Sequence, residues 1–114
     1  MFYTYGIIDN FYSYTQIKHL YIDAVTKKVF NESLHDEVLF TAIERKIFFY
    51  LYENRDSILT KEHFFEYLWQ LEDRNPNIVN VHIKKIRAKI NDQAGEMIEN
   101  IYGEGYRLNT VVKK

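Results

Sequence analysis

The segment IVNVHIKKIRAKI, residues 78–90, predicts an amphipathic helix. Successive residues of an α-helix are turned by about 100°, so the apolar residues of this segment gather in one narrow stripe. The stripe consists of Val79, Ile83, Ile86 and Ile90. The basic residues, four within six positions, are Lys84, Lys85, Arg87 and Lys89. One face is therefore expected to pack against a core, and the other to face water or a polyanion.

The polar side of this helix, which is expected to span residues 77–91, indicates contacts with DNA. Asn77 and Asn80 are poor helix formers, but their amides can donate hydrogen bonds to base edges and phosphates. Val81 lies among polar residues, where it can contact a thymine methyl group. A merely solvated helix face is the alternative interpretation of the same pattern.

Two further helices are predicted upstream. Thr41 followed by Glu44 forms a capping box at the start of the first, which is expected to end near Asn54. Thr60 is expected to cap the second. The apolar face of the first helix comprises Ile43, Ile47, Tyr50 and Leu51, together with Asn54, and that of the second comprises Phe64, Phe65, Leu68 and Trp69. The polar segment 70–77, which contains the only proline, separates the second helix from the third.

Strands are predicted on both sides of the helices. The region from about residue 11 to residue 40 is expected to form a small antiparallel meander. Gly103 and Gly105 are expected to form the turn of a hairpin, because tight hairpin turns favour glycine with a positive φ. The expected strands are 18–23, 27–32, 37–40, a short one at 57–59, and 97–102 with 106–111. This order of elements predicts an α+β fold: a winged helix-turn-helix with an N-terminal antiparallel sheet, three helices and a C-terminal β-hairpin wing.

Composition and charge limit the function. The chain has 114 residues, 46% hydrophobic and 17% aromatic, which suits one globular domain. It has no cysteine, no apolar run long enough for a membrane helix and no secretion signal, so a cytoplasmic protein is expected. Residues 1–74 carry 8 basic and 12 acidic side chains, whereas residues 75–114 carry 7 basic and 4 acidic ones. This asymmetry indicates a polyanionic partner for the C-terminal part.

No enzyme, metal site or cofactor is predicted. The four histidines show no metal-ligand spacing, and none of the three serines lies in a nucleophile motif. His82, at the edge of the basic face, is either a packed residue or a donor to a phosphate. The GEG pattern at 103–105 lacks a third glycine and precedes a strand, so it does not match a dinucleotide-binding loop.

Four stretches together resemble the OmpR/PhoB-type DNA-binding domains of bacterial response regulators. They are LFTAIERKIFFYLYEN (39–54), SILTKEHFFEYLW (57–69), IVNVHIKKIRAKI (78–90) and IYGEGYRL (101–108). The resemblance covers roughly residues 11–110. It implies a four-stranded N-terminal sheet, three helices and a wing, and binding to double-stranded DNA, usually at direct repeats and in tandem pairs, to regulate transcription.

The resemblance also implies roles for single residues. Helix 77–91 is expected in the major groove, and the wing, residues 97–110, on the adjacent backbone. Lys85 is the best candidate for a base contact, with Val81 and Asn80 beside it. The residues matching phosphate-contacting positions are Asn77, His82, Lys84, Arg87 and Trp69. The wing residues are Asn100, Tyr102, Gly103, Gly105, Tyr106 and Arg107. The segment matching a loop that contacts RNA polymerase in some members contains Leu71, Glu72, Asp73 and Arg74.

Three positions depart from the family pattern. Asn80 stands where an acid is usual, Ala88 where a basic residue is common, and Tyr102 where an arginine often enters the minor groove. Residues 1–10 are too few for a receiver domain, and are interpreted as an N-terminal segment or linker remnant before a DNA-binding domain at 11–114. The alternative function is a winged-helix module that binds protein and not DNA.

Overall fold

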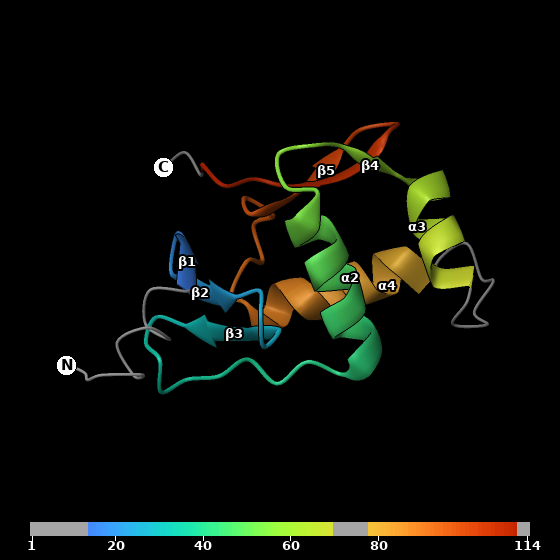
Figure 1. Ribbon diagram of the computed structural model, residues 1–114. Helices are drawn as coiled ribbons and strands as arrows, with labels where there is room; N and C mark the ends of the chain where they lie inside the picture. The colour runs from blue at the N-terminus through green and yellow to red at the C-terminus, as the bar shows by residue number, and fades with distance from the viewer. Residues whose placement is uncertain (1–13, 70–77, 112–114) are drawn as a thin grey trace. The chain divides into compact units, whose positions relative to one another are not determined.

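The computed structural model describes residues 14–69 and 78–111. They belong to two compact units with bounds at 1–38 and 39–114. The predicted domain, 11–114, spans both units. The first contains an antiparallel sheet, and the second contains the helices and the wing (Figure 1).

The described part of the first unit is a three-stranded antiparallel sheet in the order β1-β2-β3. Its strands are β1 (Tyr14–Ile17), β2 (Leu20–Asp23) and β3 (Lys28–Asn31). Asp23 shapes the β2–β3 turn, because its carboxylate accepts hydrogen bonds from the N–H groups of Val25 and Thr26 and from the Thr26 hydroxyl. The buried apolar side chains of the sheet are Ile17, Leu20, Ile22, Val29 and Phe30.

The strand predicted at 37–40 is wrong. Glu37 forms only an isolated bridge with Phe30, so the sheet has three strands within the described residues and not the four implied by the resemblance. After this bridge, Phe40 packs against Phe48 of the first helix, with ring centroids 5.4 Å apart, and the chain leads into that helix at Ala42. The third strand of the sheet is β1 (Tyr14–Ile17), which lies in the region predicted to form the meander but was not predicted as a separate strand.

The second unit combines three helices with a second three-stranded sheet. Its helices are α2 (Ala42–Glu53), α3 (Lys61–Trp69) and α4 (Ile78–Lys89), and its strands are β4 (Leu59–Thr60), β5 (Ile98–Ile101) and β6 (Gly105–Leu108). The strand order is β4-β6-β5, so the short strand before α3 adds to the edge of the β5–β6 hairpin. The predicted winged helix-turn-helix is confirmed (Figure 1).

The predicted start of α2 is confirmed in detail. The Thr41 side chain accepts from the Glu44 N–H, and the Glu44 carboxylate accepts from the Thr41 N–H at 2.9 Å. The predicted apolar face is only partly right, because Asn54 is an exposed C-cap. The buried face of the helix is wider than the predicted one, because it also includes the aromatic residues Phe48, Phe49 and Tyr52.

The predicted cap of α3 is also confirmed, with His63 as its partner. The His63 N–H donates to the Thr60 hydroxyl, and the Thr60 N–H donates to His63 Nδ1 at 3.1 Å. Phe64 is fully buried, whereas Phe65 is 39% exposed. The buried face of this helix is therefore narrower than the predicted apolar face. The side chains of Leu68 and Trp69 lie outside the described residues.

An ion pair joins α2 to α4. Lys89 Nζ lies 2.5 Å from Glu44 Oε1, and it also donates to the Leu39 carbonyl at 2.9 Å, beside the start of α2. Burial alone would raise the pKa of Glu44, but the hydrogen bonds from Lys89 and Thr41 lower it overall. Glu44 therefore stays ionised although only 2% of it is exposed.

Candidate nucleic-acid interface

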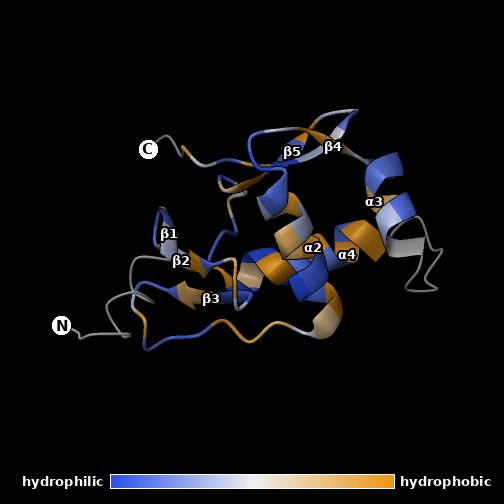
Figure 2. Cartoon of the chain, in the orientation of Figure 1, coloured by the Kyte–Doolittle hydropathy of each residue, from blue (hydrophilic) through white to orange (hydrophobic). Residues whose placement is uncertain are grey.

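The predicted apolar stripe of the third helix is confirmed. Val79, Ile83 and Ile86 of α4, and Ile90 just after it, are all buried. The opposite side of α4 is open to solvent, and the helix carries apolar and polar residues side by side (Figure 2). Its exposed residues are Asn80, Val81, Lys84, Lys85 and Ala88.

Two lysines provide the charge of this exposed face. Among the described residues, neither Lys84 nor Lys85 forms an ion pair, so both ammonium groups are available to an anion. Val81 is 45% exposed on the same helix. A cationic helix face with an apolar side chain within it suits a duplex, because lysines can bind phosphates while a methyl group contacts a base.

The other two basic residues of α4 are engaged within the domain. Lys89 binds Glu44, and Arg87 donates from Nε and Nη2 to the Ile98 carbonyl at 3.0 and 2.5 Å. Of the four basic residues predicted to form the cationic face, only Lys84 and Lys85 are therefore exposed without an ion pair to a described residue. The predicted phosphate contact of Arg87 stays a prediction, and it would have to coexist with this bond to the wing.

Asp92 completes the connection between α4 and the wing. Its carboxylate is buried and accepts three backbone N–H groups, from Glu96 at 2.9 Å, Met97 at 3.0 Å and Ile98 at 2.8 Å. The N–H of Ile98 is thus bound by Asp92 and its carbonyl by Arg87. This double attachment of the first residue of β5 fixes the wing relative to α4, and Asp92 had no predicted role.

The two wing glycines serve different purposes. Gly103 has a φ of +74°, in a turn closed by a hydrogen bond of 2.9 Å from the Glu104 N–H to the Ile101 carbonyl. Gly105 does not have a positive φ, so the predicted reason is wrong at this position. It pairs with Thr60 of β4, and a Cβ atom there would lie 2.0 Å from the Leu59 carbonyl oxygen.

The side chains of the wing divide into exposed and engaged groups. Tyr102 is 99% exposed at the turn, and Asn100 is exposed on β5. Tyr106 is buried, and its hydroxyl donates to Asn80 Oδ1. Arg107 is bound to Glu99 at 2.8 Å and to Asn109 at 2.8 Å. Because its guanidinium is already bound to these two side chains, Arg107 does not simply replace the arginine that the family pattern places at position 102.

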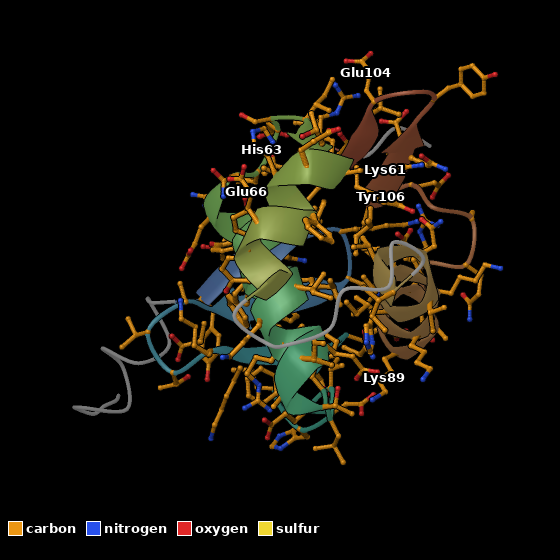
Figure 3. All side chains as sticks on the ribbon, turned by 90° about the vertical axis from the view of Figure 1, so that its right-hand side faces the viewer. Lys61, His63, Glu66, Lys89, Glu104 and Tyr106 are labelled. Atoms are coloured by element: carbon orange, nitrogen blue, oxygen red, sulfur yellow. The ribbon has the colours of Figure 1, made fainter. Side chains whose placement is uncertain are left out.

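A groove of about 450 Å³ lies where the start of α3 and the wing meet. Its lining includes Lys61, the wing turn 102–104, Asn80 and Tyr106. Figure 3 shows Lys61 beside the wing strand that carries Tyr106, with Glu104 at the outer end of the wing. The groove therefore offers a ligand two amides, from Asn80 and Asn100, and one cation, together with the carboxylates of Glu62 and Glu104.

The remaining predicted site residues are only partly covered by the structure. His82 is half-buried, at the boundary of the exposed face. Asn77 and the four residues predicted near RNA polymerase, Leu71, Glu72, Asp73 and Arg74, lie outside the described residues, as does the side chain of Trp69. Within residues 14–69 and 78–111, no cluster of side chains is placed to hold a metal ion, and no helix is long and apolar enough to cross a membrane.

A helix-turn-helix with an open basic face, followed by a β-hairpin, defines a winged-helix protein. Residues 35–108 match the family described as "Transcriptional regulatory protein, C terminal", and the chain belongs to this family. Over 102 residues it is 98% identical to the uncharacterized transcriptional regulatory protein YbdJ of Bacillus subtilis (strain 168). That match covers 90% of this chain and 46% of the relative, so the chain spans less than half the length of this relative.

Solved structures show the same fold. The response regulator DrrB of Thermotoga maritima, an OmpR/PhoB homolog, is 30% identical with a TM-score of 0.73, over 85% of this chain and 44% of that one. The DNA-binding domain of the response regulator AdeR, in complex with an intercistronic region, is 25% identical with a TM-score of 0.67. That match covers 83% of this chain and 98% of the AdeR chain. The resemblance to the OmpR/PhoB type is therefore confirmed.

Proposed function

We propose that this chain binds double-stranded DNA in a sequence-specific manner to regulate transcription. In this proposal α4 enters the major groove and the wing lies on the adjacent backbone. The observation that carries it is the exposed face of α4, where Lys84, Lys85 and Val81 stand on a helix held rigidly by its buried stripe. The likeness to a domain solved with DNA supports the same function.

Further parts of the proposal follow from family membership. We propose a cytoplasmic protein without catalytic activity or cofactor, whose DNA-binding domain belongs to a response regulator or to a regulator without a receiver. Direct-repeat sites, tandem pairing on DNA and a contact of the 70–77 segment with RNA polymerase are proposed on the same ground.

Lys84 and Lys85 are expected to play different roles, and their alanine variants test the proposal. Lys84→Ala should weaken binding to all duplexes and lower the salt slope by about one unit, because one phosphate contact is lost. Lys85→Ala should cost about 1–3 kcal/mol at one base position and relax specificity there. Binding-site selection from random duplexes, followed by affinity measurements at several salt concentrations, gives both quantities.

Lys46→Ala is the matched control for these variants, because it removes an exposed lysine from α2. It should leave the affinity and the salt slope unchanged. If the wild-type domain selects no duplex and shows no salt-dependent binding, DNA binding is ruled out. If Lys46→Ala weakens binding as much as Lys84→Ala, the basic face of α4 is not the interface.

Tyr102→Arg tests the position of the wing. The side chain is 99% exposed, so the free energy of unfolding should stay within about 0.5 kcal/mol of wild type. If the wing lies on the duplex, the added cation should raise DNA affinity and steepen the salt slope by about one unit. Val25→Arg, which adds the same charge at an 83% exposed position in the β2–β3 turn, is the control. An unchanged affinity for Tyr102→Arg would show that the wing does not touch the minor groove.

A protein partner is the alternative supported by one observation. The wing turn presents a fully exposed tyrosine and the acidic Glu104, which suit a protein surface better than a phosphate backbone. Amide chemical shifts on addition of a selected duplex separate the two functions. Shifts along the exposed face of α4 indicate DNA binding, and their absence there favours the protein-interaction module.

A further inference from the structure

The contact between Tyr106 and Asn80 joins the wing to the exposed start of α4. We propose that Tyr106 is a positioning residue, which holds the Asn80 amide so that its NH₂ group faces outward and donates to a hydrogen-bond acceptor of DNA. This proposal rests on the DNA-binding function proposed above. It assigns to a buried wing residue a role in how the recognition helix reads its target.

Tyr106 is well placed to act as a fixed support. It lies on β6, only 5% of it is exposed, and its ring packs edge-to-face on Phe64 with centroids 5.9 Å apart. The hydroxyl group reaches across to Asn80, which is exposed on the first turn of α4. An exposed asparagine on a helix can otherwise rotate about its side-chain bonds. The hydrogen bond from Tyr106 restricts this rotation in Asn80.

The direction of the hydrogen bond follows from the chemistry of the phenol. Asn80 Oδ1 is the acceptor that the described residues offer to the Tyr106 hydroxyl. If the amide were turned round, the partly buried O–H would lose this acceptor, which is unfavourable. Burial raises the pKa of Tyr106 against the opposing effect of Arg87, so the proton stays on the phenol at neutral pH. The orientation with Oδ1 toward the tyrosine is therefore the favoured one.

This orientation determines what Asn80 offers to a ligand. Its Nδ2 carries two N–H donors, and no described residue accepts from them. In the major groove the acceptors are purine N7, guanine O6 and thymine O4, to which the backbone adds the phosphate oxygens, whereas the cytosine amino group is a donor and is disfavoured. Residues at the start of a recognition helix are those that reach base edges in helix-turn-helix proteins.

The test compares four forms of the 114-residue chain: wild type, Tyr106→Phe, Asn80→Ala and the double variant. Tyr106→Phe keeps the buried ring and removes only the hydroxyl. Tyr50→Phe is the matched control, because it removes a hydroxyl that donates to the His63 carbonyl at 3.4 Å on α3. Affinities are measured for the duplex that the wild type selects and for a scrambled duplex of equal length, at one salt concentration.

We expect Tyr106→Phe to weaken binding about threefold or more, since a single well-placed hydrogen bond is worth about that factor. A loss confined to the selected duplex identifies a base edge as the acceptor, and an equal loss on both duplexes identifies a phosphate. In the Asn80→Ala background, Tyr106→Phe should have less than about a twofold further effect. Tyr50→Phe should change neither affinity.

The proposal is overturned if Tyr106→Phe binds both duplexes as the wild type does, or if its loss is the same with and without Asn80. In that case DNA binding itself stands, because the wild type still selects its duplex. If the wild type selects none, both proposals fail together.

A measurement without DNA tests the positioning alone. The side-chain NH₂ group of Asn80 should be rigid in nitrogen relaxation experiments on the wild type and become mobile in Tyr106→Phe. Asn100, which is exposed in the same groove, provides the reference for a less restrained amide. Equal mobility of Asn80 and Asn100 in the wild type would contradict the proposed role of Tyr106.

Discussion

Gly105→Ala is expected to lower the free energy of unfolding by about 3 kcal/mol or more, although it adds only one methyl group. The added Cβ would lie 2.0 Å from the Leu59 carbonyl oxygen and 2.9 Å from the Thr60 Cα. Both obstacles are backbone atoms of β4, which pairs with β6 at this point. They cannot rotate away as a side chain can, so β4 must separate from the wing. Chemical denaturation measures the loss.

Gly103→Ala is the matched control, two residues away in the turn that precedes β6. Its φ of +74° makes alanine unfavourable by about 1 kcal/mol, but a Cβ there meets no atom within 4 Å. The two variants therefore separate backbone strain from steric exclusion. If Gly103→Ala is the more destabilising, or if Gly105→Ala costs less than about 1 kcal/mol, the close approach of β4 does not determine the choice of glycine at position 105.

Local patterns in the sequence predicted most of the second unit. The capping box of Thr41 and Glu44, the cap at Thr60 and the buried stripe of α4 involve residues within one or two helical turns. Glycine at position 103 is also required by a local feature, the positive φ of the turn. Gly105 was predicted in the right element for the wrong reason, because the strand that excludes a side chain there comes from residue 59, far earlier in the chain.

The basic face was predicted less well for a related reason. Spacing places Lys84, Lys85, Arg87 and Lys89 on one helix, but it does not show which of them meets a partner from another element. Arg87 is engaged by the carbonyl of a wing strand, and Lys89 by a carboxylate on α2. Long basic side chains reach partners that become neighbours only after folding. The signal for Lys89 was available in part, since Glu44 sits on a buried face and needs a cation.

Asp92 shows how such a distant contact determines the geometry of the site. An acid directly after a basic helix indicates the end of the cationic face, and no pattern in residues 92–98 predicts that its carboxylate binds the N–H groups of residues 96–98. In the structure it gathers the N–H groups of three successive residues that lead into β5. Together with Arg87 on the Ile98 carbonyl, it sets the angle between the helix and the wing that a duplex would meet.

Asp92→Asn should therefore destabilise the domain by about 3 kcal/mol, although the side chain keeps its shape. One carboxylate oxygen accepts from Glu96 and Met97, and the other accepts from Ile98. An amide offers one oxygen, so its NH₂ group must face a backbone donor in a site that is only 3% exposed. The charge that strengthens all three hydrogen bonds is also lost. Denaturation and amide exchange at Ile98 measure the effect.

Asp56→Asn provides the comparison, because that carboxylate also accepts two hydrogen bonds, from the Thr110 N–H at 2.9 Å and the Thr110 hydroxyl at 2.6 Å. These bonds lower the pKa of Asp56, but the residue is exposed, and water can replace them. We expect a much smaller loss there. Because Asp92 fixes the wing, the Asp92→Asn variant should also bind a selected duplex less tightly under conditions where it is still folded. An equal loss of stability in the two variants would show that the buried position of Asp92 contributes nothing special to the wing.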